Sequence, residues 1–467
     1  MKRKNWVIEN LEIIDAGAEG KAVGKHEGLT VFVPYVVPGD IADVQVFKRK
    51  KGYLEAKLLK INKLSPYRID PKCSHFGLCG GCKWQIMDYT QQLFFKQKQV
   101  KDNFQHLGKF EYPPIMPILA SEKYYFYRNK LEFTFTNLRW LDNEDVARQN
   151  NGEPIDTKGL GFHIPGKFDK VLDIQQCYLQ TDPSNAIRLN IKKFCIENTL
   201  PFYNIRTHEG LMRNLIIRTA SSGEVMVIVV FTEASDKSLS LMRFLQTKFP
   251  SITSLYYVVN AKLNDSISDL TPILFHGTAY ITEMMETLQF KISPVSFFQI
   301  NSEQALQLYR VTREFAQIGK DDIVYDLYTG TGTIANFVAA QAKKVIGIEY
   351  VDAAIEDAKD NAQLNGIVNT CFFAGDMAKV FTKDFVETNG KPDIVITDPP
   401  RAGMHANVIE QLLTLQPKRI VYVSCNPATQ ARDITLLSTC YRVIKIQPVD
   451  MFPHTHHVEN VVLLELQ

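Results

Sequence analysis

Residues 291–467 alternate strand-like and helix-like segments, and this alternation restricts the possible fold more than any other feature of the chain. Short apolar runs, from "DDIVYDLYTG" to "VENVVLLEL", are mostly separated by amphipathic segments such as "DAAIEDAKDNAQLNG". Strands that alternate with helices form a parallel sheet with helices on both faces. A loop joins the last two runs, so we expect the final strand to be antiparallel. The pattern predicts a doubly wound α/β domain.

Two further regions precede this domain. Residues 1–62 are rich in β-formers and punctuated by glycines, which predicts a small five-stranded barrel with a basic hairpin tip at Lys48–Lys51. Residues 63–290 have mixed α/β character and open with a cysteine cluster. A chain of 467 residues is long enough for about two to four domains. We therefore expect three domains, with boundaries near residues 62 and 290.

The overall composition is that of an ordinary globular protein, with 45% hydrophobic and 22% charged residues. The net charge of +2 does not indicate a nucleic-acid binder, so any such surface must come from local clustering. The N-terminus lacks the apolar core of a signal peptide, and "VMVIVVF" is too short to cross a bilayer. We expect a soluble cytoplasmic protein with no membrane contact, in which the eight cysteines serve metal binding or catalysis rather than disulfides.

A glycine-rich turn, "YDLYTGTGTIANF", follows the first strand of the C-terminal region. Gly330 and Gly332 allow a tight turn and the close approach of a ligand. Glu349 ends the second strand, at a distance suited to binding ribose hydroxyls. Because Gly330, Gly332 and Ala335 also satisfy the loose dinucleotide fingerprint, NAD and S-adenosylmethionine are both candidate ligands, besides a turn that binds nothing.

The fourth strand ends in "TDPPRAG", and its Asp398 and two prolines separate the two cofactors. The prolines remove two backbone donors and stiffen the loop. Asp-Pro-Pro at this strand end resembles the nucleic-acid methyltransferases, in which it lines the pocket between the methyl donor and a base. A dehydrogenase does not need it, so S-adenosylmethionine is favoured, although a purely structural turn also fits the sequence.

The fifth strand ends at Cys425, in "VYVSCNPATQ", where a strand gives way to a loop. Carbon 5 of uracil is a poor nucleophile, but a thiolate that adds at carbon 6 converts the ring to an enolate whose carbon 5 can accept a methyl group. A base must then remove the carbon-5 proton so that the thiolate can leave. Cysteine suits both the addition and the departure. An amino-group methyltransferase needs no cysteine here and typically has an aromatic residue in place of Arg401.

The general base is expected near the C-terminus, in "HTHHVENVVLLEL". Glu459 immediately precedes the final strand, so it can reach the pocket of Cys425. His454, His456 and His457 are alternatives, although a loose group of histidines more often belongs to a surface loop.

Together these segments resemble the RNA (uracil-5-)-methyltransferases, which make 5-methyluridine in ribosomal or transfer RNA. The resemblance rests on "DLYTGTGT", "TDPPRAG", "VYVSCNPATQARD", "HHVENVVLLEL", "SPVSFFQIN", "YRNKLEFTF" and "CSHFGLCGGCKWQ". It covers essentially the whole chain. It implies a Rossmann-like catalytic domain, S-adenosylmethionine as cofactor and RNA as substrate.

The resemblance implies a role for each matching residue. Cys425 matches the nucleophile, Glu459 matches the base, and Asp398 matches a residue that holds the pyrimidine edge or stabilises the enolate. Thr333 stands where an asparagine is frequent in the family. The residues implied to bind the methyl donor are Gln299, Tyr328, Gly330, Thr333, Glu349, Asp376 and Asp398.

The N-terminal barrel resembles the TRAM domain, an OB-like barrel of RNA-modifying enzymes. Such barrels hold nucleic-acid strands with basic and aromatic surface, so Lys48–Lys51 is the candidate contact. In the central region, Arg128, Lys130, Arg213 and Arg218 lie on β-rich runs and are candidates for phosphate contacts. A structural role is an equally good interpretation for each of these four residues.

The cysteine cluster has the spacing Cys73-x5-Cys79-x2-Cys82, with glycines that let the loop wrap around a metal group. This spacing does not separate zinc from an iron–sulfur cluster. The resemblance adds Cys177 as the fourth ligand and implies a [4Fe-4S] cluster with a structural role in the central domain. The cysteines expected to be plain core or surface thiols are Cys195, Cys371 and Cys440.

The resulting hypothesis is an S-adenosylmethionine-dependent RNA uracil-5-methyltransferase of class EC 2.1.1 that acts as a monomer without an obligate protein partner. Ribosomal RNA, specifically 23S, is preferred to transfer RNA because the barrel and the full cysteine set resemble the ribosomal branch. One alternative is an RNA cytosine-5-methyltransferase, which would normally carry a second cysteine where Arg401 follows Pro400. The other is an inactive RNA-binding factor, against which the intact Cys425, Asp398 and Glu459 argue.

Overall fold

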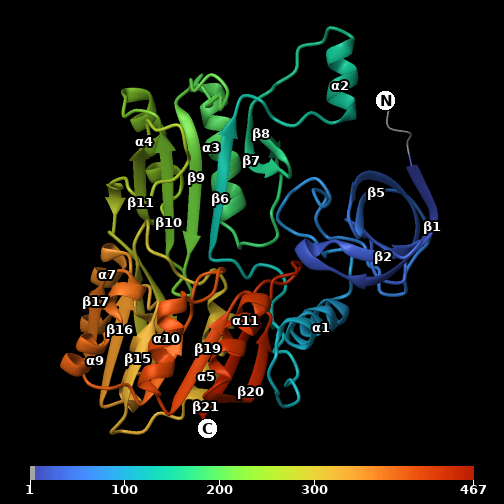
Figure 1. Cartoon of the computed structure of the whole chain (residues 1–467). Coiled ribbons are helices and arrows are strands. Elements are labelled where there is room, and N and C mark those ends of the chain that lie inside the picture. Colours follow the sequence, from blue (N-terminus) through green and yellow to red (C-terminus); the bar gives the residue numbers. More distant parts are fainter. Residues whose placement is uncertain (1–5) are drawn as a thin grey trace.

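The computed structural model describes residues 6–467, which form a barrel, a central sheet and a C-terminal sheet (Figure 1). The barrel is closed, with strand order β1-β2-β3-β5-β4. Alternate residues of its strands, among them Ile8, Val44 and Ala56, are buried in one core. Its elements are β1 (Trp6–Ala16), the short 3-10 helix η1 (Ala18–Gly20), β2 (Ala22–His26), β3 (Leu29–Val33), β4 (Ile41–Lys50) and β5 (Tyr53–Lys63). Residues 1–5 of the expected barrel region lie outside the described part of the chain.

The basic run Lys48–Lys51 lies at the end of β4 and in the turn to β5, so the predicted hairpin tip is confirmed. The Lys48 ammonium pairs with Glu55 on β5 at 2.5 Å. The guanidinium of Arg49 lies over the ring of Trp6, 5.8 Å from its centroid. The last two lysines of the run are exposed at the tip.

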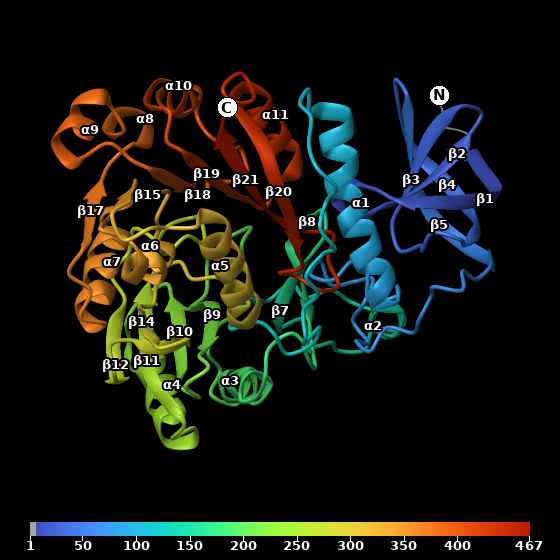
Figure 2. The same cartoon turned by 90° about the horizontal axis from the view of Figure 1, so that it is seen from below.

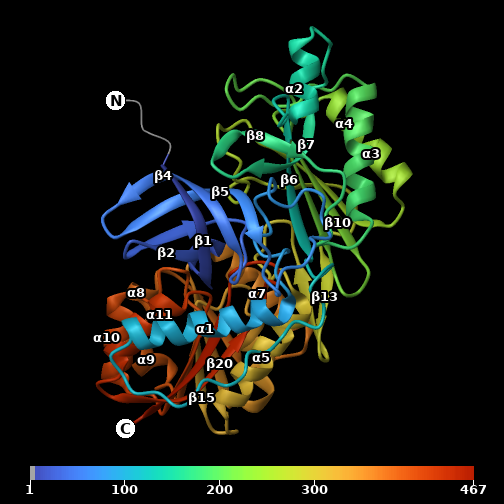
Figure 3. The same cartoon turned by 90° about the vertical axis from the view of Figure 1, so that its right-hand side faces the viewer.

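Helix α1 (Tyr89–Leu107) joins the barrel to the C-terminal sheet and lies between them (Figures 2 and 3). Asp88 caps it by accepting a hydrogen bond from the backbone N–H of Thr90 at 2.9 Å. Its buried residues Val100 and Phe104 belong to a core shared with the C-terminal sheet. Lys98 reaches back to Asp15 of the barrel at 2.7 Å. The helix therefore fixes the barrel against the rest of the molecule.

The central sheet has seven strands in the order β12-β11-β10-β9-β6-β7-β8. The apolar run "VMVIVVF" is its strand β10, buried over all seven residues. Val227 and Val229 face a core that includes Leu241 of α4, whereas Met226 and Ile228 face the C-terminal domain. Burial on both faces explains the unbroken apolar sequence. The elements are β6 (Lys130–Thr136), α2 (Asn143–Asn150), β7 (Gly159–Ile164), β8 (Lys167–Asp173), α3 (Ser184–Glu197), β9 (Met212–Thr219), β10 (Val225–Phe231), α4 (Asp236–Lys248), β11 (Ile252–Val259) and β12 (Ile273–Gly277).

The C-terminal sheet has the order β17-β16-β15-β18-β19-β21-β20. Strands β15 to β19 are parallel, and β21 is antiparallel to both neighbours, which confirms the expected doubly wound domain and its reversed last strand. Its strands are β15 (Ile323–Leu327), β16 (Lys344–Glu349), β17 (Thr370–Ala374), β18 (Ile394–Thr397), β19 (Arg419–Ser424), β20 (Tyr441–Val449) and β21 (Glu459–Leu466), preceded by the hairpin β13 (Ile281–Met285) and β14 (Leu288–Ile292). Its helices are α5 (Ser302–Ala316), α6 (Thr333–Val338), η2 (Ala339–Gln341), α7 (Asp352–Leu364), α8 (Met377–Val380), α9 (Lys383–Asn389), α10 (Ala406–Leu415) and α11 (Pro427–Leu437).

Two of the arginines considered for phosphate contacts lie in the protein interior instead. Arg213 is 1% exposed, and its guanidinium donates hydrogen bonds to the carbonyls of Asn260 at 2.8 Å and Asn264 at 2.9 Å. Arg218 is 5% exposed and donates to the carbonyl of Ser296 at 2.7 Å. Buried guanidinium groups engaged with carbonyls cannot reach a phosphate, so the structural interpretation is the correct one for both.

None of the helices within residues 6–467 is long and apolar enough to span a membrane. Cys195 is fully buried in the central core, as expected for a core thiol, whereas Cys371 and Cys440 are half-buried.

Candidate active site

The carboxyl ends of β15, β16, β18 and β19 meet at one edge of the C-terminal sheet, where the strand order reverses between β15 and β18. This edge is where doubly wound sheets bind ligands. The glycine-rich turn after β15 needs its glycines, since a Cβ on Gly332 (φ +71°) would lie 2.7 Å from the Cβ of Ala358. Tyr328, just before this turn, also has positive φ, at +65°.

Glu349 at the end of β16 is tied to the neighbouring turn. Its carboxylate accepts a hydrogen bond from the backbone N–H of Gly330 at 3.2 Å and another from that of Val351 at 3.1 Å. Thr333 begins α6, and its hydroxyl lies 3.2 Å from that of Thr331. These hydrogen bonds hold Glu349 and the glycine-rich turn in a fixed arrangement at the edge of the sheet.

Two further residues expected to bind the donor border this edge. Asp376 caps α8 and accepts from the backbone N–H of Ala378 at 3.1 Å. The ring of Tyr328 is half-buried beside it, and burial raises the pKa of Tyr328 to about 12. The structure therefore brings Tyr328, Glu349 and Asp376 to the same end of the sheet.

Gln299 reaches the same edge from the segment that precedes α5. The hydroxyl of Thr331 in the glycine turn donates to the carbonyl of Phe297 at 3.5 Å, which places this segment against the turn. The carbonyl of Gln299 itself accepts from Asn129 Nδ2 at 2.8 Å. The segment is thereby connected to the central sheet as well.

Asp326 is a further candidate for the site that was not singled out from the sequence. It is fully buried on β15, where one carboxylate oxygen accepts from Thr329 Oγ1 at 2.5 Å and from the backbone N–H of Ala335 at 3.0 Å. The other oxygen, Oδ1, has no hydrogen-bond partner. Burial raises the pKa of Asp326 to about 7. An acidic residue two places before the turn was visible in the sequence, but its burial was not.

The register of β19 and β21 brings Cys425 and Glu459 together. Ser424 is opposite Asn460 in this antiparallel pair, so the residues one step beyond them, Cys425 and Glu459, face one another at the sheet edge. Asn460 Nδ2 donates to Gln430 Oε1 at 2.8 Å, and Gln430 Nε2 donates to the carbonyl of Asn460 at 3.1 Å. This reciprocal pair locks the start of β21 to the helix that follows Cys425.

The electrostatics of this pocket oppose the ionisation of its acids. Burial and the nearby Asp398 raise the pKa of Glu459, which is 4% exposed, to about 8. Burial and Asp326 raise the pKa of Asp398 to about 7. Burial, Glu459 and Asp398 raise the pKa of Cys425 to about 11, an effect that Arg401 partly offsets. A cationic ligand would favour the ionised forms of all these groups.

Arg401 is placed by the helix that follows the cysteine, which the sequence analysis did not foresee. Its carbonyl accepts from Asn426 Nδ2 at 3.0 Å and from Thr429 Oγ1 at 3.2 Å. Arg432 Nη2 donates to the carbonyl of Ala402 at 2.8 Å. The loop after Asp-Pro-Pro is thus held to α11, and the guanidinium of Arg401 lies close to Cys425 and Glu459.

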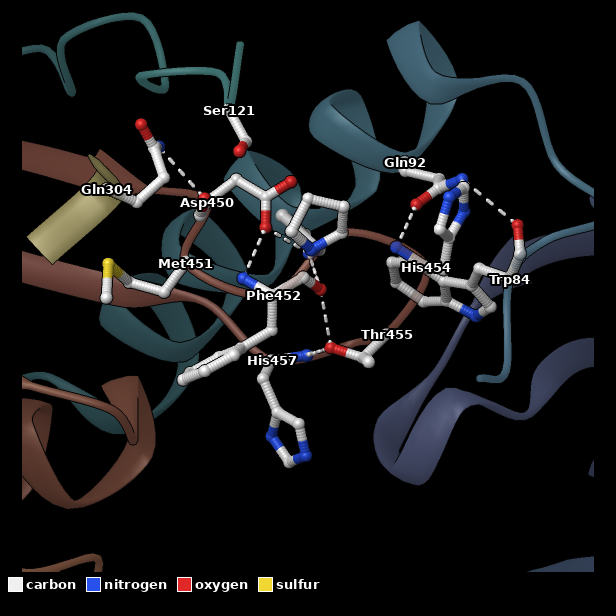
Figure 4. A network of polar contacts seen from close by, with 12 residues as sticks. Trp84, Gln92, Ser121, Gln304, Asp450, Met451, Phe452, His454, Thr455 and His457 are labelled. Carbon is white, nitrogen blue, oxygen red and sulfur yellow. Dashed lines mark hydrogen bonds and ion pairs between the residues drawn. The ribbon is translucent and has the colours of Figure 1, made fainter. Parts of the chain in front are cut away.

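His454 serves the structure of the loop between β20 and β21 (Figure 4). Its ring is 1% exposed and lies 3.2 Å from Gln92 Nε2, and its carbonyl accepts from the backbone N–H groups of Lys83 at 2.8 Å and Trp84 at 3.0 Å. Burial and the charge of Lys96 lower the pKa of His454 to about 4. The contacts of His454 thus hold the β20–β21 loop against α1 and the segment that precedes it.

His456 and His457 are half-buried in the same loop, with ring centroids 4.1 Å apart. Burial and neighbouring cations lower the pKa of His456 to about 4, and burial and His456 lower that of His457 to about 3. Both rings are therefore neutral at physiological pH.

The four cysteines of the predicted metal site line one cavity of about 260 Å³ in the central domain. Cys73, Cys79 and Cys82 come from the loop after the barrel, and Cys177 comes from the segment between β8 and α3. Burial raises the pKa of Cys82 to about 12 and that of Cys177 to about 11. Within residues 6–467, no three His, Cys, Asp or Glu side chains converge as ligands of a single metal ion.

Specific contacts hold the two cysteine-bearing segments against each other. His75 Nε2 accepts from the backbone N–H of Gln175 at 2.9 Å. Asn185 on α3 accepts from the N–H of Cys177 at 2.8 Å and donates to its carbonyl at 3.1 Å. Thr455 of the β20–β21 loop also lines the cavity. The cysteine cavity and the loop that leads to Glu459 are therefore in direct contact.

Comparison with known proteins identifies the family. Residues 274–467 match the family model described as tRNA (Uracil-5-)-methyltransferase, and residues 8–59 match the TRAM domain. A relative from Bacteroides thetaiotaomicron, described as an uncharacterized RNA methyltransferase, is 56% identical over 96% of this chain and 100% of its own. A second, from Porphyromonas gingivalis, is 55% identical over 97% of this chain and 99% of its own.

The chain belongs to the RNA (uracil-5-)-methyltransferase family. Its structure resembles that of the Pyrococcus abyssi tRNA (uracil-54, C5)-methyltransferase in complex with S-adenosyl-L-homocysteine, with a TM-score of 0.74, 30% identity and coverage of 99% of this chain and 100% of that one. The resemblance inferred from the sequence is thus confirmed, as are the TRAM domain and the enzyme class EC 2.1.1.

Proposed function

We propose that this methyltransferase transfers a methyl group from S-adenosylmethionine to carbon 5 of a uridine in RNA, through a covalent adduct between Cys425 and carbon 6. The observation that most supports this proposal is the register of β19 and β21, which sets Cys425 opposite Glu459. Asp398 completes the pocket from the end of the neighbouring strand β18.

Three residues divide the reaction between them. The Cys425 thiolate forms a bond to carbon 6, and the electrons of the 5,6 double bond move to oxygen 4 as an enolate. Carbon 5 then takes the methyl group from the sulfonium, and S-adenosylhomocysteine leaves. Glu459 removes the carbon-5 proton, the double bond re-forms and the thiolate is expelled. Asp398, whose raised pKa of about 7 leaves it partly protonated, can donate a hydrogen bond to the enolate oxygen.

The methyl donor binds along the edge formed by the glycine turn and the ends of β16 to β18. Glu349 and Asp376 accept hydrogen bonds from hydroxyl and amino groups of the donor, and the glycine turn lets the ligand approach the backbone. The sulfonium carries a positive charge, which suits a pocket containing the buried carboxyls Asp326 and Glu459 and the half-buried carboxyl Asp398. The residues proposed to contact the donor are Gln299, Tyr328, Gly330, Thr333, Glu349, Asp376 and Asp398.

Cys73, Cys79, Cys82 and Cys177 are proposed to hold a [4Fe-4S] cluster. Zinc requires four ligands at roughly 2.0–2.3 Å from one centre, whereas these thiols surround a cavity of about 260 Å³ and do not converge on a single ion position. Four thiols spread around a cavity would suit a group larger than a single ion. When bound, the cluster supplies a rigid link between the two cysteine segments, and we assign it no step in methyl transfer.

Ribosomal RNA, specifically 23S RNA, is our first proposal for the substrate, on the strength of the TRAM barrel and the four cysteines. Transfer RNA is the second candidate, because the matching family model and the solved Pyrococcus relative are both described as transfer RNA enzymes. Either RNA would be held in part by the exposed lysines at the tip of the β4–β5 hairpin.

Mass-spectrometric mapping of 5-methyluridine in cells with and without the gene tests the function and separates the two substrates. We expect one uridine of 23S RNA to lose its methyl group when the gene is removed and to regain it when the wild-type gene is restored. The Cys425→Ala gene should not restore it. Loss of 5-methyluridine from transfer RNA alone would assign the second substrate, and unchanged modification of both RNAs would contradict the proposed function.

A further inference from the structure

Three aromatic side chains beside the cysteine cavity surround one lysine. The ammonium of Lys72 lies 5.0 Å from the ring centroid of Tyr125, 5.1 Å from that of Phe126 and 4.8 Å from that of Tyr178. Cation–π contacts explain why the lysine side chain is held here. The Lys72 side chain is exposed, so its charge is available to an anionic ligand.

Phe126 adopts a backbone conformation that is unfavourable for a large side chain. Its φ is +55°, and its ring remains 37% exposed. Positive φ in a bulky residue is rare and is associated with ligand clamps. Two hydrogen bonds hold this segment to the one that carries Tyr178. The N–H of Phe126 donates to the carbonyl of Tyr178 at 2.8 Å, and the N–H of Arg128 donates to the carbonyl of Leu179 at 2.7 Å.

The cluster is close to the candidate active site. The ring of Tyr125 packs against that of His454, with centroids 4.4 Å apart. His454 belongs to the loop that leads to Glu459, and Figure 4 shows this loop running past Thr455 to His457. The cluster therefore flanks the loop that leads to Glu459, and Phe126 offers a partly exposed aromatic ring beside it.

We propose that Phe126 and Lys72 bind one unpaired RNA base next to the target uridine. The exposed ring of Phe126 stacks on the base, the ring of Tyr178, at 71° to it, borders the base edge-on, and the ammonium contacts its phosphate. Exposed rings stack on any base, and a lysine among them adds affinity for the backbone. The inference rests on the proposed function, since the occupant is the RNA substrate.

Phe126→Ala, Phe126→Leu and Phe126→Tyr test the stacking role. The probe is a single-stranded oligouridine RNA with one 2-aminopurine, whose fluorescence is quenched on stacking. We expect Phe126→Ala to weaken RNA binding by about five-fold or more and to reduce the quenching. Phe126→Tyr should keep the wild-type RNA affinity and quenching. Phe126→Leu should lose both, because leucine fills the volume without offering an aromatic face. S-adenosylmethionine binding should be unchanged in all three.

Phe94→Ala is the matched control. Phe94 is 57% exposed on α1, two residues from Gln92, and so points to the opposite side of the helix from the β20–β21 loop. Its loss should leave RNA binding unchanged.

Lys72→Met tests the phosphate contact independently of the rings. We expect the slope of log affinity against log salt concentration to fall by about one, and Lys72→Arg to retain the wild-type slope. A packing role for the lysine would leave the slope unchanged.

The outcomes separate this site from the enzyme's function. Wild-type protein that binds and methylates RNA, with Phe126→Ala indistinguishable from Phe94→Ala, would overturn the stacking site alone. Wild-type RNA binding by Phe126→Leu as well as by Phe126→Tyr would also overturn it, because packing without an aromatic face would then suffice. Wild-type protein that neither binds nor methylates RNA would overturn the proposed function and this site together.

Discussion

Lys96 on α1 and Asp450 in the β20–β21 loop form an ion pair of 2.5 Å in which both side chains are completely buried. The pair joins positions 354 residues apart in the sequence. Asp450 also accepts a hydrogen bond from the Tyr89 hydroxyl at 2.8 Å, and its carbonyl accepts from Gln304 Nε2 at 2.9 Å. The loop that ends at Glu459 is therefore anchored to the helix that carries the barrel (Figure 4).

Lys96→Met should destabilise the protein by about 3–5 kcal/mol, because it leaves Asp450 buried without its partner. Denaturant unfolding measures the change. Lys96→Met combined with Asp450→Asn should recover much of the loss, since neither charge remains. Lys123→Met is the control: its ion pair with Glu303 is more than half exposed, so its loss should change the free energy of unfolding by less than about 1 kcal/mol. If Lys96→Met lowered the free energy of unfolding as little as Lys123→Met does, the buried pair would contribute nothing to stability.

Glu459→Gln should stall the enzyme as a protein–RNA adduct through Cys425. Thiolate addition and methyl transfer do not require the carbon-5 proton to leave, whereas release does, and glutamine cannot accept that proton. A complex that survives denaturing electrophoresis and contains methylated RNA is the expected product. The double variant with Cys425→Ala should form none. Normal turnover by Glu459→Gln would contradict its role as the base, and His456 and His457 would then be tested.

The stability of the free protein should depend on the pH through Glu459. Its pKa is raised from 4.5 to about 8 in the folded state, so between these values the folded protein binds more protons than the unfolded chain. The stabilisation from the protonated carboxyl is present below about pH 4.5 and is lost as the pH rises towards 8.

Urea unfolding at pH 5.5 and pH 8 measures this dependence. Glu459→Gln stays neutral, so relative to wild type it should gain stability with rising pH, by an amount on the order of a few kcal/mol. Glu465→Gln, on the same strand but partly exposed, should show no such gain. If the unfolding free energy of Glu459→Gln changed between pH 5.5 and pH 8 by the same amount as that of wild type, the pKa of Glu459 would not be raised.

Glu349→Ala should weaken binding of S-adenosylmethionine while the fold is retained. The carboxylate is proposed to accept charge-assisted hydrogen bonds from ribose hydroxyls, each worth roughly 1.5–3 kcal/mol, and it also fixes the N–H of Gly330. Titration calorimetry gives the affinity. Glu356→Ala, on the exposed face of α7, is the control and should bind as wild type does. Wild-type affinity in Glu349→Ala would remove this residue from the donor site.

Anaerobically purified protein should be brown and contain about four irons per chain. Cys177→Ser should lose most of this iron, whereas Cys371→Ser, on β17 outside the cavity, should retain it. Stoichiometric zinc with no iron, in protein made with ample iron, would contradict the cluster.

The sequence by itself determined the features that depend on short stretches of chain. The order of strands and helices in residues 291–467 requires a doubly wound sheet, and the strand-end position of Asp398 and Cys425 places both at one edge. The close spacing of Cys73, Cys79 and Cys82 likewise predicts a loop of metal ligands, which stays a prediction, although the structure brings these thiols to one cavity with Cys177. Such signals are local, because periodicity, turn geometry and motif spacing act over a few residues.

Only the tertiary structure decided which charged groups are buried and which distant segments meet. Arg213 has the charge that suits a phosphate contact, yet its side chain lies in the interior among backbone carbonyls. The raised pKa of Glu459, the pairing of Lys96 with Asp450, and the packing of Tyr125 on His454 arise from segments far apart in the chain. Burial and pairing of this kind depend on the packing of the whole chain, which no local pattern in the sequence encodes.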